Sequence, residues 1–158
     1  MSIKDQIVKL KKIGFPDNED YDIDNAVNIL NDIAQRADNG EIDALCGIFN
    51  DELEPSLESD LIETIFHIIE CNGFEEGLYE LTLGLLSTSQ DASVCVKRTF
   101  KTLLNSEDFI KPYKRVVKKM AFSKREEVLN ILREIVDRQP DQYAEKVNYL
   151  LGDINDQL

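Results

Sequence analysis

The sequence predicts an all-α domain built from repeated helical hairpins, with one additional helix at the N-terminus. Apolar residues recur at helical spacing along almost the whole chain, and no stretch shows the alternation of a β-strand. Turn signals recur at a nearly constant step. The 158 residues, of which 42% are hydrophobic, fit a single domain spanning residues 1–158 with a substantial core.

The turns are spaced by 33 or 34 residues and begin at Asn39, Asn72, Asn105 and Gln139. The acidic residues that open the helix after each turn are Glu41, Glu75, Asp108 and Asp141. Two helices per unit at such a fixed step are the signature of an α-solenoid. Tetratricopeptide and ankyrin signature residues are absent, so we expect a HEAT- or armadillo-like stack of about four hairpins. An ordinary helical bundle with evenly spaced turns is the alternative.

The chain begins with a short amphipathic helix predicted over residues 2–13, which places Ile3, Ile7, Leu10 and Ile13 on one face. Several lysines make this helix basic. A glycine and a proline shortly after it end the helix.

The loop over residues 16–24 carries five carboxylates. It lacks the central glycine and the closing glutamate of an EF-hand, so we expect a solvated acidic loop rather than a calcium site. Asp24 then caps a helix that runs to Ala37, and a shorter helix follows over residues 42–49. An acidic linker over residues 51–56, broken by a proline, leads to the centre of the chain.

The central hairpin spans residues 59–86 and contains no Lys or Arg. A helix over about residues 60–71 and a leucine-rich helix flank a turn that ends at Gly73. Gly73 suits the left-handed residue that ends a helix, and Glu75 and Glu76 suit the first turn of the next one. The residues expected to face the core are Leu61, Ile65, Phe66, Ile68, Ile69, Leu78, Leu81, Leu83, Leu85 and Leu86.

The third hairpin is predicted to begin with a helix over residues 92–104. Its inward residues are Val94, Cys95, Phe100, Leu103 and Leu104. The next helix is expected to start near Lys111, because Pro112 is tolerated as a first helical residue. Ser123 and Glu126 then form the pattern of a capping box at the start of a further helix.

The last helix is predicted after the turn over residues 139–141, with four apolar residues facing inward. They are Tyr143, Val147, Leu150 and Leu151. Gly152 is expected to end this helix, and the polar tail over residues 153–158 is expected to fray.

The three cysteines, Cys46, Cys71 and Cys95, are widely spaced in apolar helical patterns and form no CxxC pair. We therefore expect buried free thiols, as is typical of a reducing compartment. The N-terminus lacks the apolar core of a signal peptide, and no apolar run reaches the length of a membrane span. A cytoplasmic protein without membrane association is expected.

Charge is unevenly distributed along the chain. The net charge of −13 argues against nucleic acid and anionic membranes as partners and favours a cationic partner. Residues 16–63 carry a net −14 and residues 64–96 a net −5, and no Lys or Arg occurs from 37 to 96. A solvated surface needs acidic residues but does not need basic ones excluded. The pattern therefore favours a binding surface over a merely soluble acidic protein.

The stretch over residues 97–125 is basic, with a net +8, and interleaves Phe100, Phe109 and Tyr113 with its cations. No nucleic-acid-binding signature is present, and the whole chain repels phosphate. We expect this stretch to pair with acidic neighbours or to form a second contact zone for the same partner. The sequence leaves these two alternatives open.

No residue pattern indicates catalysis. His67 is the single histidine, and Glu63 and Glu70 share its helix face, which indicates a surface histidine more than a catalytic base. There is no nucleophile elbow, no glycine-rich phosphate loop and no metal-ligand set beyond carboxylates. We predict a protein that is not an enzyme, with no catalytic residue, cofactor or metal.

The central stretch resembles a known family. A helix ending in FHIIE, a second helix GLYELTLGLL and a third closing RTFKTLLNS resemble the helical immunity proteins of bacterial polymorphic-toxin and contact-dependent inhibition systems. Ile69 and Glu70, then Arg98 and the pair Leu104 and Asn105, match the family pattern. The tryptophans common in that pattern are absent. The resemblance covers about a third of the chain and implies a HEAT-like fold and a role in neutralising a cognate toxin, often a nuclease.

The leading hypothesis is an immunity protein that occludes the active site of a cationic toxin domain. Its carboxylates would stand in for the phosphates of the toxin's nucleic-acid substrate, and aromatic side chains would anchor the contact. The alternative is an acidic α-solenoid adaptor or regulatory module that binds a protein or peptide without any toxin.

The predicted binding surface lies in the part of the chain that lacks Lys and Arg, with Tyr79 as its aromatic anchor. Its residues are Asp51, Glu52, Glu54, Glu58, Glu63, Glu70, Glu75, Glu76, Tyr79 and Glu80. We expect them on helix faces opposite the apolar stripe, or in the loops that join the helices.

Overall fold

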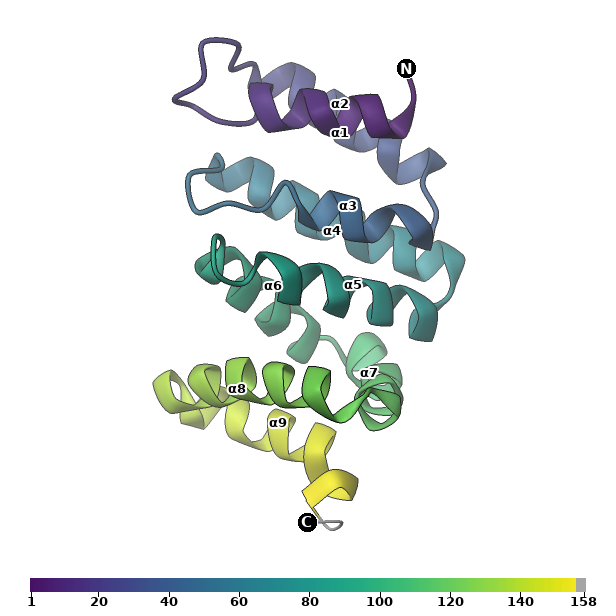
Figure 1. The fold of residues 1–158 in the computed structure, drawn as a ribbon, viewed down its shortest axis with the longest axis vertical. Helices are drawn as coiled ribbons and strands as arrows, with labels where there is room; N and C mark the ends of the chain where they lie inside the picture. Colours follow the sequence, from purple (N-terminus) through teal and green to yellow (C-terminus); the bar gives the residue numbers. More distant parts are fainter. Residues whose placement is uncertain (156–158) are drawn as a thin grey trace. The chain divides into compact units, whose positions relative to one another are not determined.

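The structure is a computed structural model that describes the backbone of residues 1–155 and the side chains of residues 1–152. In this part of the chain it contains nine α-helices, one short 3-10 helix and no strand, so the prediction of an all-α protein is confirmed (Figure 1). The helices group into two compact units, unit 1 over residues 1–96 and unit 2 over residues 97–158.

Unit 1 contains five helices, a 3-10 turn and the start of a sixth helix. They are α1 (Ile3–Ile13), α2 (Ile23–Arg36), η1 (Asn39–Glu41), α3 (Ile42–Cys46), α4 (Pro55–Asn72), α5 (Phe74–Thr88) and the first residues of α6 (Ser93–Leu104). Unit 2 contains the rest of α6, α7 (Glu107–Lys119), α8 (Phe122–Arg138) and α9 (Pro140–Asn155).

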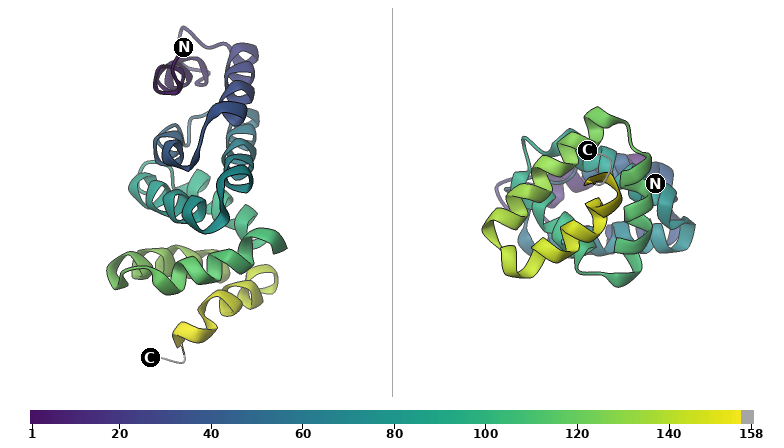
Figure 2. Two further views of the ribbon diagram at one scale, coloured as in Figure 1. Left: turned by 90° about the vertical axis from the view of Figure 1, so that its right-hand side faces the viewer. Right: turned by 90° about the horizontal axis from the view of Figure 1, so that it is seen from below.

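The helices of unit 1 lie in two rows. α2 packs against α1 and α4, whereas α3 packs against α5, and α4 and α5 contact each other across their turn. Figure 2 (left) shows α2 and α4 in one row and α1 and α3 in the other. The apolar faces of both rows meet in a core that includes Leu10, Ile33, Leu45, Leu61 and Ile65, each almost completely buried.

Turns that are one repeat apart contact each other in unit 1. The Asn39 side chain donates a hydrogen bond to the carbonyl oxygen of Gly73 at 3.2 Å, and the Asn72 side chain reaches the carbonyl oxygen of Ala37 at 3.4 Å. Gly73 has a φ of 120°, a conformation that favours glycine, as the sequence predicted. The step of 33 residues thus has a structural counterpart in unit 1. An α-solenoid over the whole chain, like a single domain over residues 1–158, stays a prediction.

Two glycines let α5 approach η1, α3 and α4 closely. A Cβ atom on Gly77 would lie 2.7 Å from both the Asn39 Oδ1 and the Ile69 Cγ1 atoms. A Cβ atom on Gly84 would lie 2.7 Å from the Cys46 Sγ atom and 2.8 Å from its Cβ atom. Because these distances are shorter than van der Waals contact, only glycine fits without displacing the neighbours.

Unit 2 packs α9 against α7 and α8. Near the turn after α6, the Lys146 ammonium donates to the Asn105 Oδ1 atom at 2.5 Å, and the Asn105 amide donates to the Tyr143 hydroxyl at 3.3 Å. Lys97 on α6 forms an ion pair with Glu134 on α8 at 2.8 Å, and this hydrogen bond lowers the pKa of the Glu134 carboxyl. These polar contacts surround a core in which Tyr113 and Leu132 are fully buried.

α2 and α4 start earlier than predicted because their N-cap residues lie earlier in the chain. Asp22, rather than Asp24, caps α2 by accepting the Asn25 backbone N–H at 3.2 Å. α4 starts at Pro55, about five residues earlier than predicted, because the Glu54 carboxylate accepts the Leu57 N–H at 2.9 Å and proline suits the first helical position. Each shift adds residues to the start of a helix without moving the apolar face behind it.

α7 starts at Glu107 rather than near Lys111, and Pro112 lies inside it. Phe109, Pro112, Tyr113 and Val116 are all buried, so the apolar face begins before the proline. Burying this face along the whole helix outweighs the one backbone hydrogen bond that proline removes.

The predicted capping box at the start of α8 is wrong. Ala121 is the N-cap residue and Ser123 lies inside the first turn, with no side-chain cap. The Arg125 guanidinium instead donates to the carbonyl oxygens of Val117, Lys118 and Met120 at 2.9–3.2 Å. These bonds provide donors for carbonyls at and just after the end of α7, where helical partners run out.

The end of α9 also differs from prediction, since the helix continues through Gly152 to Asn155. A single glycine costs only about 1 kcal/mol in a helix, and the helix can therefore pass through it. The expected fraying concerned residues 153–158. Their side chains, and the backbone of residues 156–158, lie outside the described part of the chain.

Most predicted core residues are buried, with a few exceptions. Val94 is 49% exposed, because Cys95 and Val96 take the inward positions at the start of α6. Leu83 and Leu86 are half-buried, and the inward face of α5 instead includes Thr82. Among the helices of the described residues, none has the length and apolar character required to cross a membrane.

Substitution of Gly84 with alanine should lower the free energy of unfolding by about 1–3 kcal/mol, because the added methyl group overlaps Cys46. Urea denaturation measures this change. Gly152→Ala is the matched control, since nothing lies within 4 Å of the added atom and alanine favours a helix by up to about 1 kcal/mol. A Gly84→Ala variant as stable as the wild type would contradict the close packing of α5 on α3.

Candidate functional site

The boundary between the acidic stretch over residues 16–96 and the basic stretch over residues 97–125 coincides with the boundary between the two structural units. Unit 1 contains 5 basic and 21 acidic side chains, a net charge of −16, whereas unit 2 contains 13 basic and 10 acidic ones, a net charge of +3. Four of the five Lys and Arg residues of unit 1 lie on α1, so Arg36 is the only one in the rest of this unit. Arg36 is itself paired with Asp32 at 2.6 Å.

On α4, Glu63 and Glu70 of the predicted binding surface lie in one exposed row with His67. Glu63, His67 and Glu70 follow each other at steps of four and three residues, which places them on one helix face. All three are exposed, opposite the buried stripe of the same helix. The Nε2 atom of His67 lies 3.6 Å from the Cys71 Sγ atom, and no cluster of three metal-binding side chains occurs among the described residues.

On α5, the predicted surface residues lie near its start. Glu76 and Tyr79 are exposed, Tyr79 by 44%, while Glu75 and Glu80 are half-buried. α5 belongs to the row of α3, whereas α4 belongs to the row of α2. The structure therefore divides the helical part of the predicted surface into an α4 group and an α5 group, joined by the turn at Gly73.

The loop before α4 supplies three further predicted residues, two of which have local structural roles. Glu52 is exposed. Asp51 accepts the backbone N–H of Val94 at 3.3 Å, so it also fixes the start of α6. Glu54 caps α4 and hydrogen-bonds the Ser56 hydroxyl.

Glu58 was wrongly placed on the surface, because it is only 3% exposed. The earlier start of α4 puts it on the inward side of the helix. Its carboxyl group lies beside the Cys95 thiol, whose pKa is raised to about 12 by burial and by the hydrogen bond and charge of Glu58. A buried carboxyl cannot contact a partner directly, so Glu58 is removed from the candidate surface.

The basic stretch over residues 97–125 has partly structural roles. Lys97 pairs with Glu134, Arg125 caps α7, and the Lys114 ammonium lies 4.5 Å from the centre of the Tyr149 ring. Such contacts support the alternative in which these cations pair with neighbouring groups.

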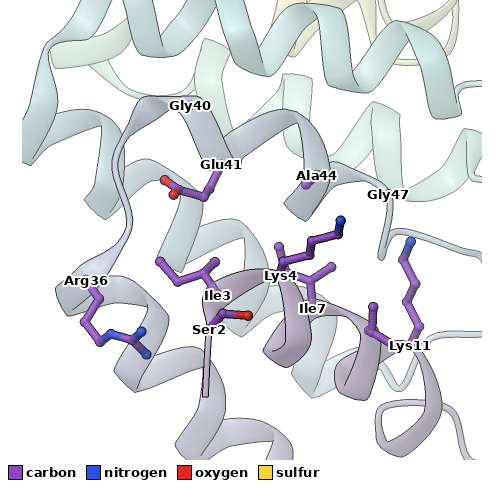
Figure 3. A pocket seen from close by; sticks show the side chains of 11 residues that line it. Ser2, Ile3, Lys4, Ile7, Lys11, Arg36, Gly40, Glu41, Ala44 and Gly47 are labelled. Atoms are coloured by element: carbon purple, nitrogen blue, oxygen red, sulfur yellow. The ribbon is translucent and has the colours of Figure 1, made fainter.

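A groove between α1 and α3 was not predicted from the sequence. It has a volume of about 740 Å³. Its lining residues are Ser2, Ile3, Lys4, Ile7, Val8, Lys11, Arg36, Gly40, Glu41, Ala44 and Gly47 (Figure 3). The one sequence feature that could have pointed to this groove was the positive charge of the first helix, which is opposite in sign to the net charge of the rest of unit 1.

Comparison of the sequence with models of known protein families identifies the family to which the chain belongs. The profile of the Immunity protein 30 family matches residues 17–113, more than half of the chain. No curated protein and no solved structure gives a significant match. An all-helical protein with this match is an immunity protein of the kind found in polymorphic-toxin systems.

The chain therefore belongs to the Immunity protein 30 family, which implies a protein that acts against a toxin. The match includes α2 to α6 and part of α7, and thus the whole predicted acidic surface. The resemblance drawn from residues 60–105 is confirmed at the level of the family.

The cysteines provide a test of the surface of unit 1. Cys46 and Cys95 are buried as predicted, but Cys71 is exposed because it lies on the outer side of α4 near its end. Burial raises the pKa of the Cys46 thiol as well as that of Cys95. Iodoacetamide at pH 8 should therefore modify one thiol in the native protein, since only a thiolate reacts.

Mass spectrometry of the native and the unfolded protein measures this number. Cys71→Ser is the control and should leave no thiol that reacts before denaturation. Rapid modification of Cys46 or Cys95 in the native wild type would contradict the described packing of α3, α4 and α6.

Proposed function

We propose that this immunity protein neutralises a cationic toxin domain, such as a nuclease, by covering its active site with the acidic surface of unit 1. The observation that supports this most is the absence of Lys and Arg from residues 37–96. The core of unit 1 requires only apolar residues facing inward, so it does not explain why the outer faces lack cations. A surface that must attract a cationic partner does explain it.

The proposed contact residues are those that the structure leaves at the surface. They are Asp51, Glu52, Glu54, Glu63, Glu70, Glu75, Glu76, Tyr79 and Glu80. Tyr79 combines an exposed ring with acidic neighbours on the same helix, as expected of an aromatic anchor within a charged rim. Most of the carboxylates would act mainly on the rate of association, and the few that become buried on binding would determine the lifetime of the complex.

The α4 and α5 groups lie in different rows of helices, and the proposal can therefore be tested one row at a time. The first variant is Glu63→Lys with Glu70→Lys on α4, and the second is Glu76→Lys with Glu80→Lys on α5. We expect at least one variant to weaken binding to the cognate toxin domain by roughly tenfold or more at low salt, with a smaller loss at high salt. Surface plasmon resonance at two salt concentrations measures this loss.

The matched control is Asp137→Lys with Glu145→Lys, which makes the same change of charge at exposed positions of unit 2. It should alter affinity by no more than about threefold. His67→Ala should leave affinity unchanged, because the proposal gives the imidazole no role. The proposal is wrong if both acidic variants bind like the wild type at low salt while reversal of Lys118 and Lys119 abolishes binding.

A further inference from the structure

The groove between α1 and α3 differs in character from the acidic surface of unit 1. Three cations line it, Lys4, Lys11 and Arg36, together with a single acid, Glu41. It therefore concentrates positive charge in the unit that carries most of the protein's negative charge. Its lining residues up to Lys11 also precede the family match, which begins at residue 17.

Two of the charged groups in the groove already form contacts within the protein. Arg36 pairs with Asp32, and the Glu41 carboxylate accepts the backbone N–H of Asp38 at 2.8 Å in a capping box. Lys4 is exposed, as is Lys11, and neither forms an ion pair with a carboxylate of the described residues. Two ammonium groups are thus available to an anionic ligand.

The floor of the groove is apolar. Ile3 and Ile7 from α1 and Ala44 from α3 lie between the cations (Figure 3). Val8, which also lines the groove, is 52% exposed. Figure 3 shows Arg36 and Lys11 at opposite ends, with Lys4 between them. Gly40 and Gly47 line the α3 side, and a residue without a side chain lets another backbone approach closely.

We infer that this groove binds a short peptide segment of a protein partner in which apolar side chains are flanked by carboxylates. The apolar side chains would cover the floor, and the flanking carboxylates would pair with Lys4 and with Lys11. The volume of about 740 Å³ lies within the range of about 300–1,000 Å³ that is typical of ligand sites. A second copy of this chain is a poorer occupant, because two units of net charge −16 repel each other.

The test uses a fluorescein-labelled peptide with the sequence Asp-Glu-Leu-Leu-Val-Leu-Glu-Asp, titrated with the full chain by fluorescence anisotropy. We expect saturable binding that Lys4→Glu with Lys11→Glu weakens by about tenfold or more. The matched control is Lys9→Glu with Lys12→Glu, which makes the same change of charge on the same helix outside the groove. It should weaken binding by no more than about threefold.

A second variant tests the shape of the groove without changing its charge. Ala44→Trp leaves the net charge unchanged but fills the floor, so it should abolish peptide binding while thermal unfolding confirms that the variant is folded. A peptide in which lysines replace the four acidic residues should not bind.

The inference is overturned if the acidic peptide does not bind, if the lysine peptide binds equally well, or if the control variant loses as much affinity. Sedimentation equilibrium tests the alternative that a second copy of this chain occupies the groove. A wild-type dimer that Lys4→Glu with Lys11→Glu dissociates would assign the groove to a second copy. Since none of these measurements involves the toxin, they are independent of the charge reversals on α4 and α5.

Discussion

Unit 1 depends on the close packing of α5 against α3 and against η1, the turn that precedes α3. Gly77 lies so near to Asn39 and Ile69, and Gly84 so near to Cys46, that a methyl group on either glycine would overlap its neighbours. Because the helices approach closely, the Asn39 amide reaches the carbonyl oxygen of Gly73 in the next turn. The spacing of 33 residues in the sequence is thereby converted into contact between neighbouring repeats.

This packing determines which side chains can meet a partner. With the apolar faces of both rows directed inward, the outer faces of α4 and α5 carry carboxylates and no Lys or Arg. Unpaired like charges destabilise a folded protein, so a net charge of −16 on unit 1 has an energetic cost. In an immunity protein, a cationic toxin would relieve that repulsion on binding, which links the charge pattern to the proposed function.

Helical periodicity and recurring turns were sufficient to predict the nine helices of the described residues and most of their buried faces. The failures arose where one local signal competed with another. Pro112 suggested a helix start, but the buried face from Phe109 onward extends the helix through it. Glu58 was assigned to the surface because it preceded the predicted helix over residues 60–71, but the earlier start of α4 turns it inward beside Cys95. The groove depends on how α1 packs against α3, a contact between distant segments that no local pattern reveals.

Amide hydrogen exchange can test whether the acidic surface of unit 1 is the toxin contact, as we propose. Exchange is compared between the free chain and its complex with the cognate toxin domain. We expect slower exchange in the complex at the loop before α4 and along α4 and α5, with little change in α7. Slower exchange confined to unit 2, with α4 and α5 unaffected, would contradict it.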